Sequence, residues 1–235
     1  MKRIKVMIIC SLILVLFTFG GINVSAMNTG FSTETLTEDQ KEIFLKNVNI
    51  SILDKEPQKN TIECFDVNSN QLIAIGQKTS ERKTICIYSK EGIFQYGYTF
   101  NCTGSFGVEW DEENLNIYFV RSDVIVSLDS NGKILDIKEV QDTISNNTHR
   151  NDLLYSTSRI VGDDEYCVGN NMGILNLFAT SYSQVIVKGV DDTESIIYDV
   201  GTTQLNTMIS TIVIIAAFVA VVIIGVVFEF IKLRR

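Results

Sequence analysis

The sequence predicts a mainly β extracellular domain of repeated four-stranded units, opened by a short helix and carried on a C-terminal transmembrane helix. Three observations lead to this fold class. Both ends of the chain are apolar, the middle alternates apolar and polar residues, and its pattern repeats after about 40 residues. The apolar ends therefore indicate export and membrane anchoring, and the repeats indicate the fold of the anchored domain.

Residues 1–26 have the pattern of a secretory signal peptide. Three basic residues among the first five precede the apolar run 6–19, and small residues occupy 24–26. The run is shorter than the roughly 20 apolar residues that a spanning helix needs. We expect cleavage after Ala26, and an uncleaved membrane anchor is the alternative.

The run 208–228 predicts a transmembrane helix. It is uncharged, and at about 1.5 Å per residue it is about 32 Å long, close to the hydrocarbon thickness of a bilayer. Residues 201–207 read as a juxtamembrane linker. Lys232, Arg234 and Arg235 lie in the tail 229–235, and the positive-inside rule puts them in the cytoplasm. We therefore expect a single-pass cell-membrane protein with its N-terminal domain outside.

The exterior part is expected to open with a helix and a linker, over 27–60. Thr37 is a good N-cap, and Gln40 three residues later completes a capping box. The apolar stripe that follows ends near Asn49, and Pro57 marks the linker.

Short β-rich runs fill residues 61–200, and they repeat. Leu72 and Leu115 occupy equivalent places 43 residues apart, and Gly92 and Gly132 are 40 apart. This offset matches one four-stranded propeller blade. A third, degraded copy runs from 159 to 200, with strands expected at 165–168, 174–178, 184–188 and 195–200. Asn131-Gly132 predicts a type I′ hairpin, because both residues tolerate positive φ.

These units resemble NHL-type β-propeller blades. The resemblance rests on Phe65-Asp66, on 87–94 and on Leu128-Asp129-Ser130-Asn131-Gly132-Lys133-Ile134, and it covers 62–140 best. It implies a blade architecture and says nothing about a ligand. About three blades fit into 62–200, whereas closed propellers use about 4–8. The propeller is then incomplete, or the sheets stack openly, or two chains complete one ring as a homo-oligomer. The whole layout also resembles membrane-anchored proteins of Gram-positive bacteria.

The exterior part is acidic. The chain has 20 basic and 28 acidic residues, of which six basic and one acidic lie in the terminal segments, so 27–207 has a net charge of −13. An acidic domain repels nucleic acid, so we expect no nucleic-acid partner. The charge is typical of a domain that must stay soluble.

The cysteines and the histidine give no metal or cofactor signature. Cys64, Cys86, Cys102 and Cys167 allow three disulfide pairings, and free buried thiols are the preferred interpretation because three of them sit in apolar strand-like runs. His149 is the single histidine and lies in a polar stretch read as a loop. A usual zinc site is not expected, and no cofactor is expected.

No catalytic motif is present, so we expect a protein that is not an enzyme. The weak candidates for ligand binding are Glu109, Trp110, Arg121 and Asp123. Trp and Arg concentrate binding energy at interfaces, and Arg121 and Asp123 fall on a loop where propellers often bind ligands. A structural interpretation is preferred, with Trp110 in the core and Arg121 paired to Asp123.

Three functions follow from these observations. The first is a surface-anchored binding or scaffold module that contacts a protein, a glycan or its own copies. The second is an extracellular glycan hydrolase or lyase that uses a pair of carboxylates. The third is an accessory subunit of a transporter or sensor, paired through its membrane span.

Overall fold

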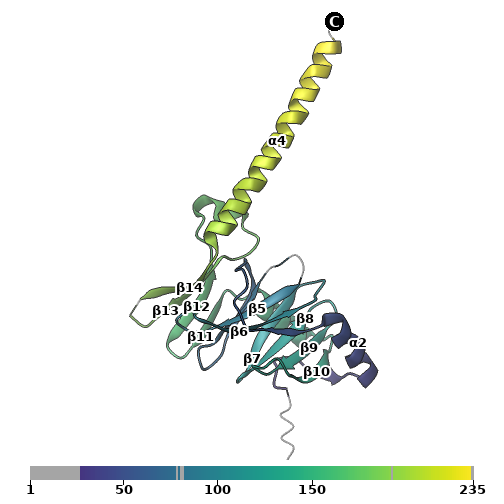
Figure 1. The fold of residues 1–235 in the computed structure, drawn as a ribbon, viewed down its shortest axis with the longest axis vertical. Helices are drawn as coiled ribbons and strands as arrows, with labels where there is room; N and C mark the ends of the chain where they lie inside the picture. The colour runs from purple at the N-terminus through teal and green to yellow at the C-terminus, as the bar shows by residue number, and fades with distance from the viewer. Residues whose placement is uncertain (1–26, 78, 80–81, 192, 234–235) are drawn as a thin grey trace, which may run out of the picture.

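The computed structural model describes residues 27–77, 79, 82–191 and 193–233. The expected signal peptide, its cleavage position, Arg234 and Arg235 lie outside the described residues. Three antiparallel sheets of five, five and four strands stand side by side, and a long helix extends away from them (Figure 1). The mainly β prediction is confirmed.

Each sheet contains four consecutive strands paired in chain order. The first sheet holds β3 (Ile62–Val67), β4 (Ile73–Gln77), β5 (Lys83–Tyr88) and β6 (Phe94–Phe100). The second holds β7 (Phe106–Asp111), β8 (Asn114–Phe119), β9 (Val124–Leu128) and β10 (Ile134–Val140). The third holds β11 (Ser158–Val161), β12 (Asp164–Gly169), β13 (Gln184–Lys188) and β14 (Glu194–Asp199).

The N-terminal residues differ from the expected helix and linker. The described chain opens with a strand, β1 (Thr33–Thr35), which pairs with β10, and the helix α2 (Glu38–Val48) comes second. Its capping box between Thr37 and Gln40 is present as expected. In the expected linker, β2 (Ser51–Leu53) pairs with β6. These two strands cover the last strands of the first two sheets, which removes exposed edges that favour aggregation.

The first and second sheets use the same turn at the positions that the repeat predicted. Gly92 and Gly132 both have positive φ, 76° and 78°, and each donates its backbone N–H to the carbonyl three residues earlier. Asn131 does not have positive φ, so the expected type I′ turn is wrong. A longer loop that ends in a left-handed glycine is another common hairpin connection.

The first sheet lies between the other two and is buried on both faces. Ile85 and Ile87 in β5 belong to the core shared with the second sheet, whereas Cys86 and Tyr88 belong to the core shared with the third. This alternation is the period of two that the sequence displays. The second sheet's other face is covered by the N-terminal segment and by helix α3 (Ile144–Tyr155), with Met27, Phe31 and Leu153 buried there.

Asp66 joins the first strands of all three sheets. From β3, its carboxylate accepts a hydrogen bond from the backbone N–H of Trp110 in β7 at 2.8 Å and from Nε of Arg159 in β11 at 2.7 Å. Burial raises the pKa of Asp66, and the hydrogen bonds from Trp110 and Arg159 oppose that rise. One short side chain therefore holds three strands together.

Two elements after the second sheet differ from expectation. The polar stretch around His149, expected as a loop, is helix α3. The apolar stretch expected as a strand at 174–178 is a 3₁₀ helix, η1 (Gly173–Phe178), and β11 supplies the fourth strand of the third sheet instead. A short apolar run does not by itself distinguish a strand from a helical turn.

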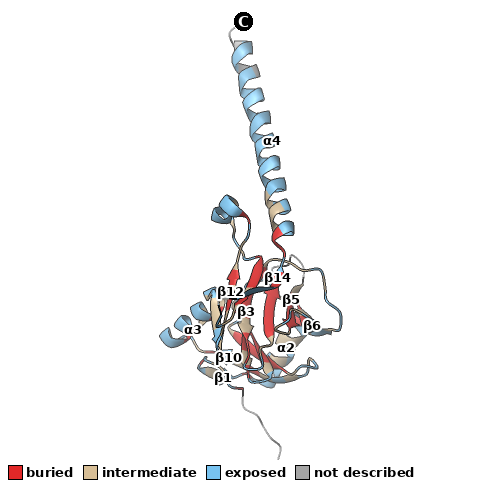
Figure 2. Ribbon diagram, turned by 90° about the vertical axis from the view of Figure 1, so that its left-hand side faces the viewer, coloured by how far each residue is buried: buried red, intermediate tan, exposed pale blue. Residues whose placement is uncertain are grey.

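Helix α4 (Gly201–Leu233) follows the last strand after one residue and is long and apolar enough to cross a membrane. The residues of α4 from 209 to 227 are exposed (Figure 2). At about 1.5 Å per residue its 33 residues extend about 50 Å. The expected linker, 201–207, forms its first two turns.

Candidate functional site

A cleft opens at the end of the sheets from which α4 leaves, and we call it the junction cleft. It has a volume of about 1120 Å³. Five segments line it: the start of β3, the β4–β5 loop with the start of β5, the β6–β7 loop, the end of α3 and the β12–β13 loop. The residues used below are Glu63, Lys83, Cys102, Thr103, Ser105, Tyr155, Asn170, Asn176, Ser181 and Tyr182.

One charged pair forms part of the cleft wall. Lys83 Nζ lies 2.7 Å from Glu63 Oε2, and both side chains are mostly buried. The ammonium also lies 5.8 Å from the centre of the Phe106 ring, within the range of a cation–π contact. Because the two charges offset each other, the wall presents hydrogen-bonding groups with little net charge.

The rest of the lining is mostly neutral. Thr103 and Ser105 contribute hydroxyls, Asn170 contributes an amide whose Oδ1 is buried without a hydrogen-bond partner, and Tyr155 contributes an exposed ring. Cavities with an apolar wall and a few polar groups are the usual ligand sites of proteins. The cleft is therefore suited to a neutral, hydrogen-bonding ligand or peptide segment.

The thiol in the cleft is not an activated nucleophile. Cys102 Sγ lies 3.3 Å from the carbonyl oxygen of Gly104, to which it donates, and burial raises the pKa of this thiol. A raised pKa keeps the group protonated, and the thiolate is the reactive form. All four cysteines of the described residues are free, but only Cys64 and Cys86 are buried, so the preferred interpretation of free buried thiols holds for two of the four.

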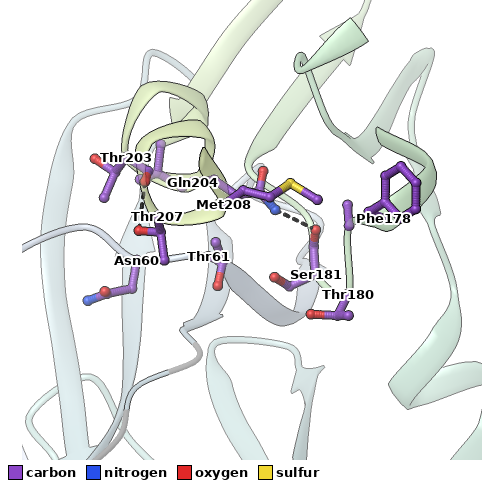
Figure 3. A pocket seen from close by; sticks show the side chains of 11 residues that line it. Asn60, Thr61, Phe178, Thr180, Ser181, Thr203, Gln204, Thr207 and Met208 are labelled. Atoms are coloured by element: carbon purple, nitrogen blue, oxygen red, sulfur yellow. Dashed lines mark hydrogen bonds between the residues drawn. The ribbon is translucent and has the colours of Figure 1, made fainter. Parts of the chain in front are cut away.

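A smaller cavity of about 340 Å³ separates the β12–β13 loop from the base of α4 (Figure 3). Residues 179–181 line both this cavity and the junction cleft. Gln204 Nε2 of α4 donates to the carbonyl oxygen of Ser181 at 2.9 Å. The junction cleft and the base of α4 are thus separated by a single stretch of chain.

Of the candidates proposed from sequence, Glu109 and Trp110 lie on opposite faces of β7. Glu109 accepts from the hydroxyl of Thr29, and its Oε2 lies 2.8 Å from Nε2 of His149. Trp110 is partly buried against the core between the first two sheets, and its indole N–H donates to the carbonyl oxygen of Asp66 at 3.4 Å. Glu109 therefore links the N-terminal segment to α3, and Trp110 packs against the edge of the core and is only partly buried.

Arg121 and Asp123 do not form the expected ion pair. Asp123 pairs with Arg150 of α3 at 2.7 Å and also accepts from the hydroxyl of Tyr118. Arg121 is exposed and donates to the hydroxyl of Thr103 at 3.4 Å, so it lies beside the wall of the junction cleft. The structure does not bring the four candidates together, and none of them lines the cleft.

The cleft residues were missed because they come from five separate segments with no shared local pattern. One signal was present: no charged residue lies between Glu165 and Lys188. Part of this stretch is buried in β12 and β13, and the rest is the loop that lines the cleft. Among the residues that the structure describes, no group of three or more His, Cys, Asp or Glu side chains is placed to hold a metal ion.

Comparison with family models, with curated proteins and with solved structures gave no match for this chain.

Proposed function

We propose that the chain is a membrane-anchored extracellular binding module, held by α4 as a single span, whose junction cleft takes a ligand close to the bilayer surface. One observation carries the proposal: the cleft and the base of α4 lie at the same end of the β domain and share the wall 179–181. A ligand in the cleft would therefore lie near the membrane that α4 enters.

The orientation follows from charge and geometry. Lys232 follows the apolar stretch of α4, and the positive-inside rule puts it in the cytoplasm. The described chain begins at the end of the β domain opposite to α4 (Figure 1). That position supports removal of the signal after Ala26, since an uncleaved anchor and α4 would leave from opposite ends of the domain.

The propeller-like architecture belongs to the same proposal. Its support is that each sheet has four strands in chain order and that Asp66 ties the first strands of all three. The outer face of the third sheet exposes Ile160 and Ile196. A further blade would cover this face, and a second copy of the chain would supply one if two chains complete a ring.

Site-specific photo-crosslinking in membranes tests the binding role. A photoreactive amino acid replaces Tyr155, which lines the cleft, and in a matched control it replaces Ile144 at the other end of α3. Both side chains are exposed, at 73% and 87%. We expect a discrete adduct from position 155 that weakens in Ser105→Trp, because the indole occupies part of the cleft. Equal adducts from both positions, or an adduct unaffected by Ser105→Trp, would contradict the proposal.

A further inference from the structure

The β12–β13 loop, residues 170–183, exposes a cluster of large apolar side chains. Ile174, Leu177 and Phe178 of η1 are exposed by 83%, 83% and 67%. No charged residue lies between Glu165 and Lys188 in the sequence around them. Contiguous exposed apolar side chains on a soluble surface mark a contact with a protein or a membrane.

The polar side chain of η1 and part of the backbone around it find hydrogen-bond partners within the loop, whereas Asn170 Oδ1 and Ser183 Oγ, at the two ends of the loop, do not. Asn176 Oδ1 accepts from the backbone N–H of Met172 at 2.9 Å, and its Nδ2 donates to the carbonyl oxygen of Asn170 at 3.1 Å. The backbone N–H of Leu175 also donates to the carbonyl oxygen of Met172. A segment that enters lipid must satisfy its own backbone, because acyl chains offer no hydrogen-bond partner.

The loop stands beside the base of α4, and Figure 2 shows its exposed turn of helix level with the lower part of α4. Phe178 and Met208 line the same small cavity, and Met208 is the first residue of the predicted transmembrane run 208–228 (Figure 3). The two turns of α4 before Met208 extend about 10 Å. The headgroup layer is about 5–8 Å thick on each side of the bilayer, so these two turns are long enough to cross it, and Phe178, beside Met208, lies at the level where the hydrocarbon begins.

We propose that Ile174, Leu177 and Phe178 insert into the headgroup–acyl boundary of the leaflet that α4 enters. The inference rests on the proposed membrane span. The occupant is the lipid surface because these side chains lie at the depth at which α4 itself becomes apolar. Apolar side chains on a short amphipathic element bind at this boundary. Contact at two points, α4 and η1, fixes how the junction cleft is oriented over the membrane.

Tryptophan fluorescence in vesicles tests the insertion. The full-length chain carrying Phe178→Trp is reconstituted into phosphatidylcholine–phosphatidylglycerol vesicles that contain lipids brominated on the acyl chains. The chain with Trp110 alone gives the baseline. We expect Phe178→Trp to lose fluorescence to the brominated lipid, to shift its emission to shorter wavelength and to resist quenching by aqueous acrylamide.

Two further variants separate the possible failures. Ile160→Trp, similarly exposed but on the outer face of the third sheet, should not respond to brominated lipid, whether that face meets water or a second copy of the chain. Phe218→Trp in α4 reports the span itself and should be quenched by brominated lipid. If Phe218→Trp is quenched and Phe178→Trp behaves like Ile160→Trp, the insertion is refuted and the span stands. Protection of Phe178→Trp from both quenchers would refute it as well, because a second copy or another protein would then cover the loop. If Phe218→Trp is not quenched, the span and the insertion both fail.

Discussion

Replacing Asp66 by asparagine removes the charge that joins the three sheets while keeping the shape of the side chain. The amide offers one acceptor oxygen where the carboxylate offers two, so either Trp110 or Arg159 faces an N–H₂ group instead. Leaving one buried N–H unsatisfied costs about 1–3 kcal/mol, and breaking a buried ion pair costs about 3–5 kcal/mol. Arg159 retains some exposure and regains water, so we expect a loss of about 2–4 kcal/mol in the free energy of unfolding.

Urea unfolding of the full chain in detergent micelles measures this loss, with Trp110 as the fluorescent reporter. Asp123→Asn is the matched control, since it removes the same charge from a pair whose side chains are 45% and 24% exposed. Exposed pairs contribute about 0–1 kcal/mol, so the control should unfold nearly as the wild type does. Equal, small losses in the two variants would refute the role of Asp66 as the shared anchor of the sheets.

The same site predicts a pH dependence. Burial raises the pKa of Asp66 above its value in the unfolded chain, so the folded protein keeps this proton to a higher pH. Protonation of Asp66 therefore adds stability that is fully present below the unfolded pKa and is lost as the pH rises through the folded pKa, on top of the contribution of the hydrogen bonds to Trp110 and Arg159. The difference in stability between wild type and Asp66→Asn should change over that window. A difference that stays constant with pH would contradict the raised pKa.

Two further predictions concern the core between the sheets. A Cβ added at Gly76 would lie 2.5 Å from Cys64 Sγ and 2.9 Å from the Phe106 ring. Gly76→Ala should therefore lower the free energy of unfolding in urea by about 1–3 kcal/mol. An unchanged urea midpoint would show that the first two sheets pack less closely than the structure has them. Burial raises the pKa of Cys86 to about 12, so in the folded chain a thiol reagent at pH 8 should modify Cys102 well before Cys86, whereas equal rates would contradict the burial of Cys86.

The sheets could be predicted from sequence because their information is local. β4 and β5 alternate between two cores, and that period of two is visible in the residues themselves. The repeat located Gly92 and Gly132, whose positive φ the shared turn requires. The blade motif contains Asp66 but does not indicate its partners, because Trp110 in β7 and Arg159 in β11 lie 44 and 93 residues away.

The remaining elements depend on contacts that no local pattern contains. β1 is a polar strand of three residues that exists because β10 offers an open edge. Helix α3 buries only Asn146 and Leu153, so it lacks the apolar stripe that would predict a helix. The run 174–178 predicts a strand because it is apolar, and apolar runs usually pack into a sheet. In the structure it is η1, and its large side chains face outward. The junction cleft combines five segments, and none of them is distinctive alone.

The claim that the junction cleft faces the membrane is tested most directly by energy transfer from the cleft to labelled lipid headgroups. In the first variant Cys167 is replaced by serine, and a fluorophore on Cys102 reports the cleft. In the second variant Cys102 and Cys167 are both replaced by serine, and a fluorophore on Ser130→Cys reports the turn between β9 and β10. That turn lies at the far end of the second sheet, about 20 Å from the cleft along a six-residue strand. We predict clearly stronger transfer from Cys102 than from position 130. Equal transfer, or stronger transfer from position 130, would contradict the proposed orientation.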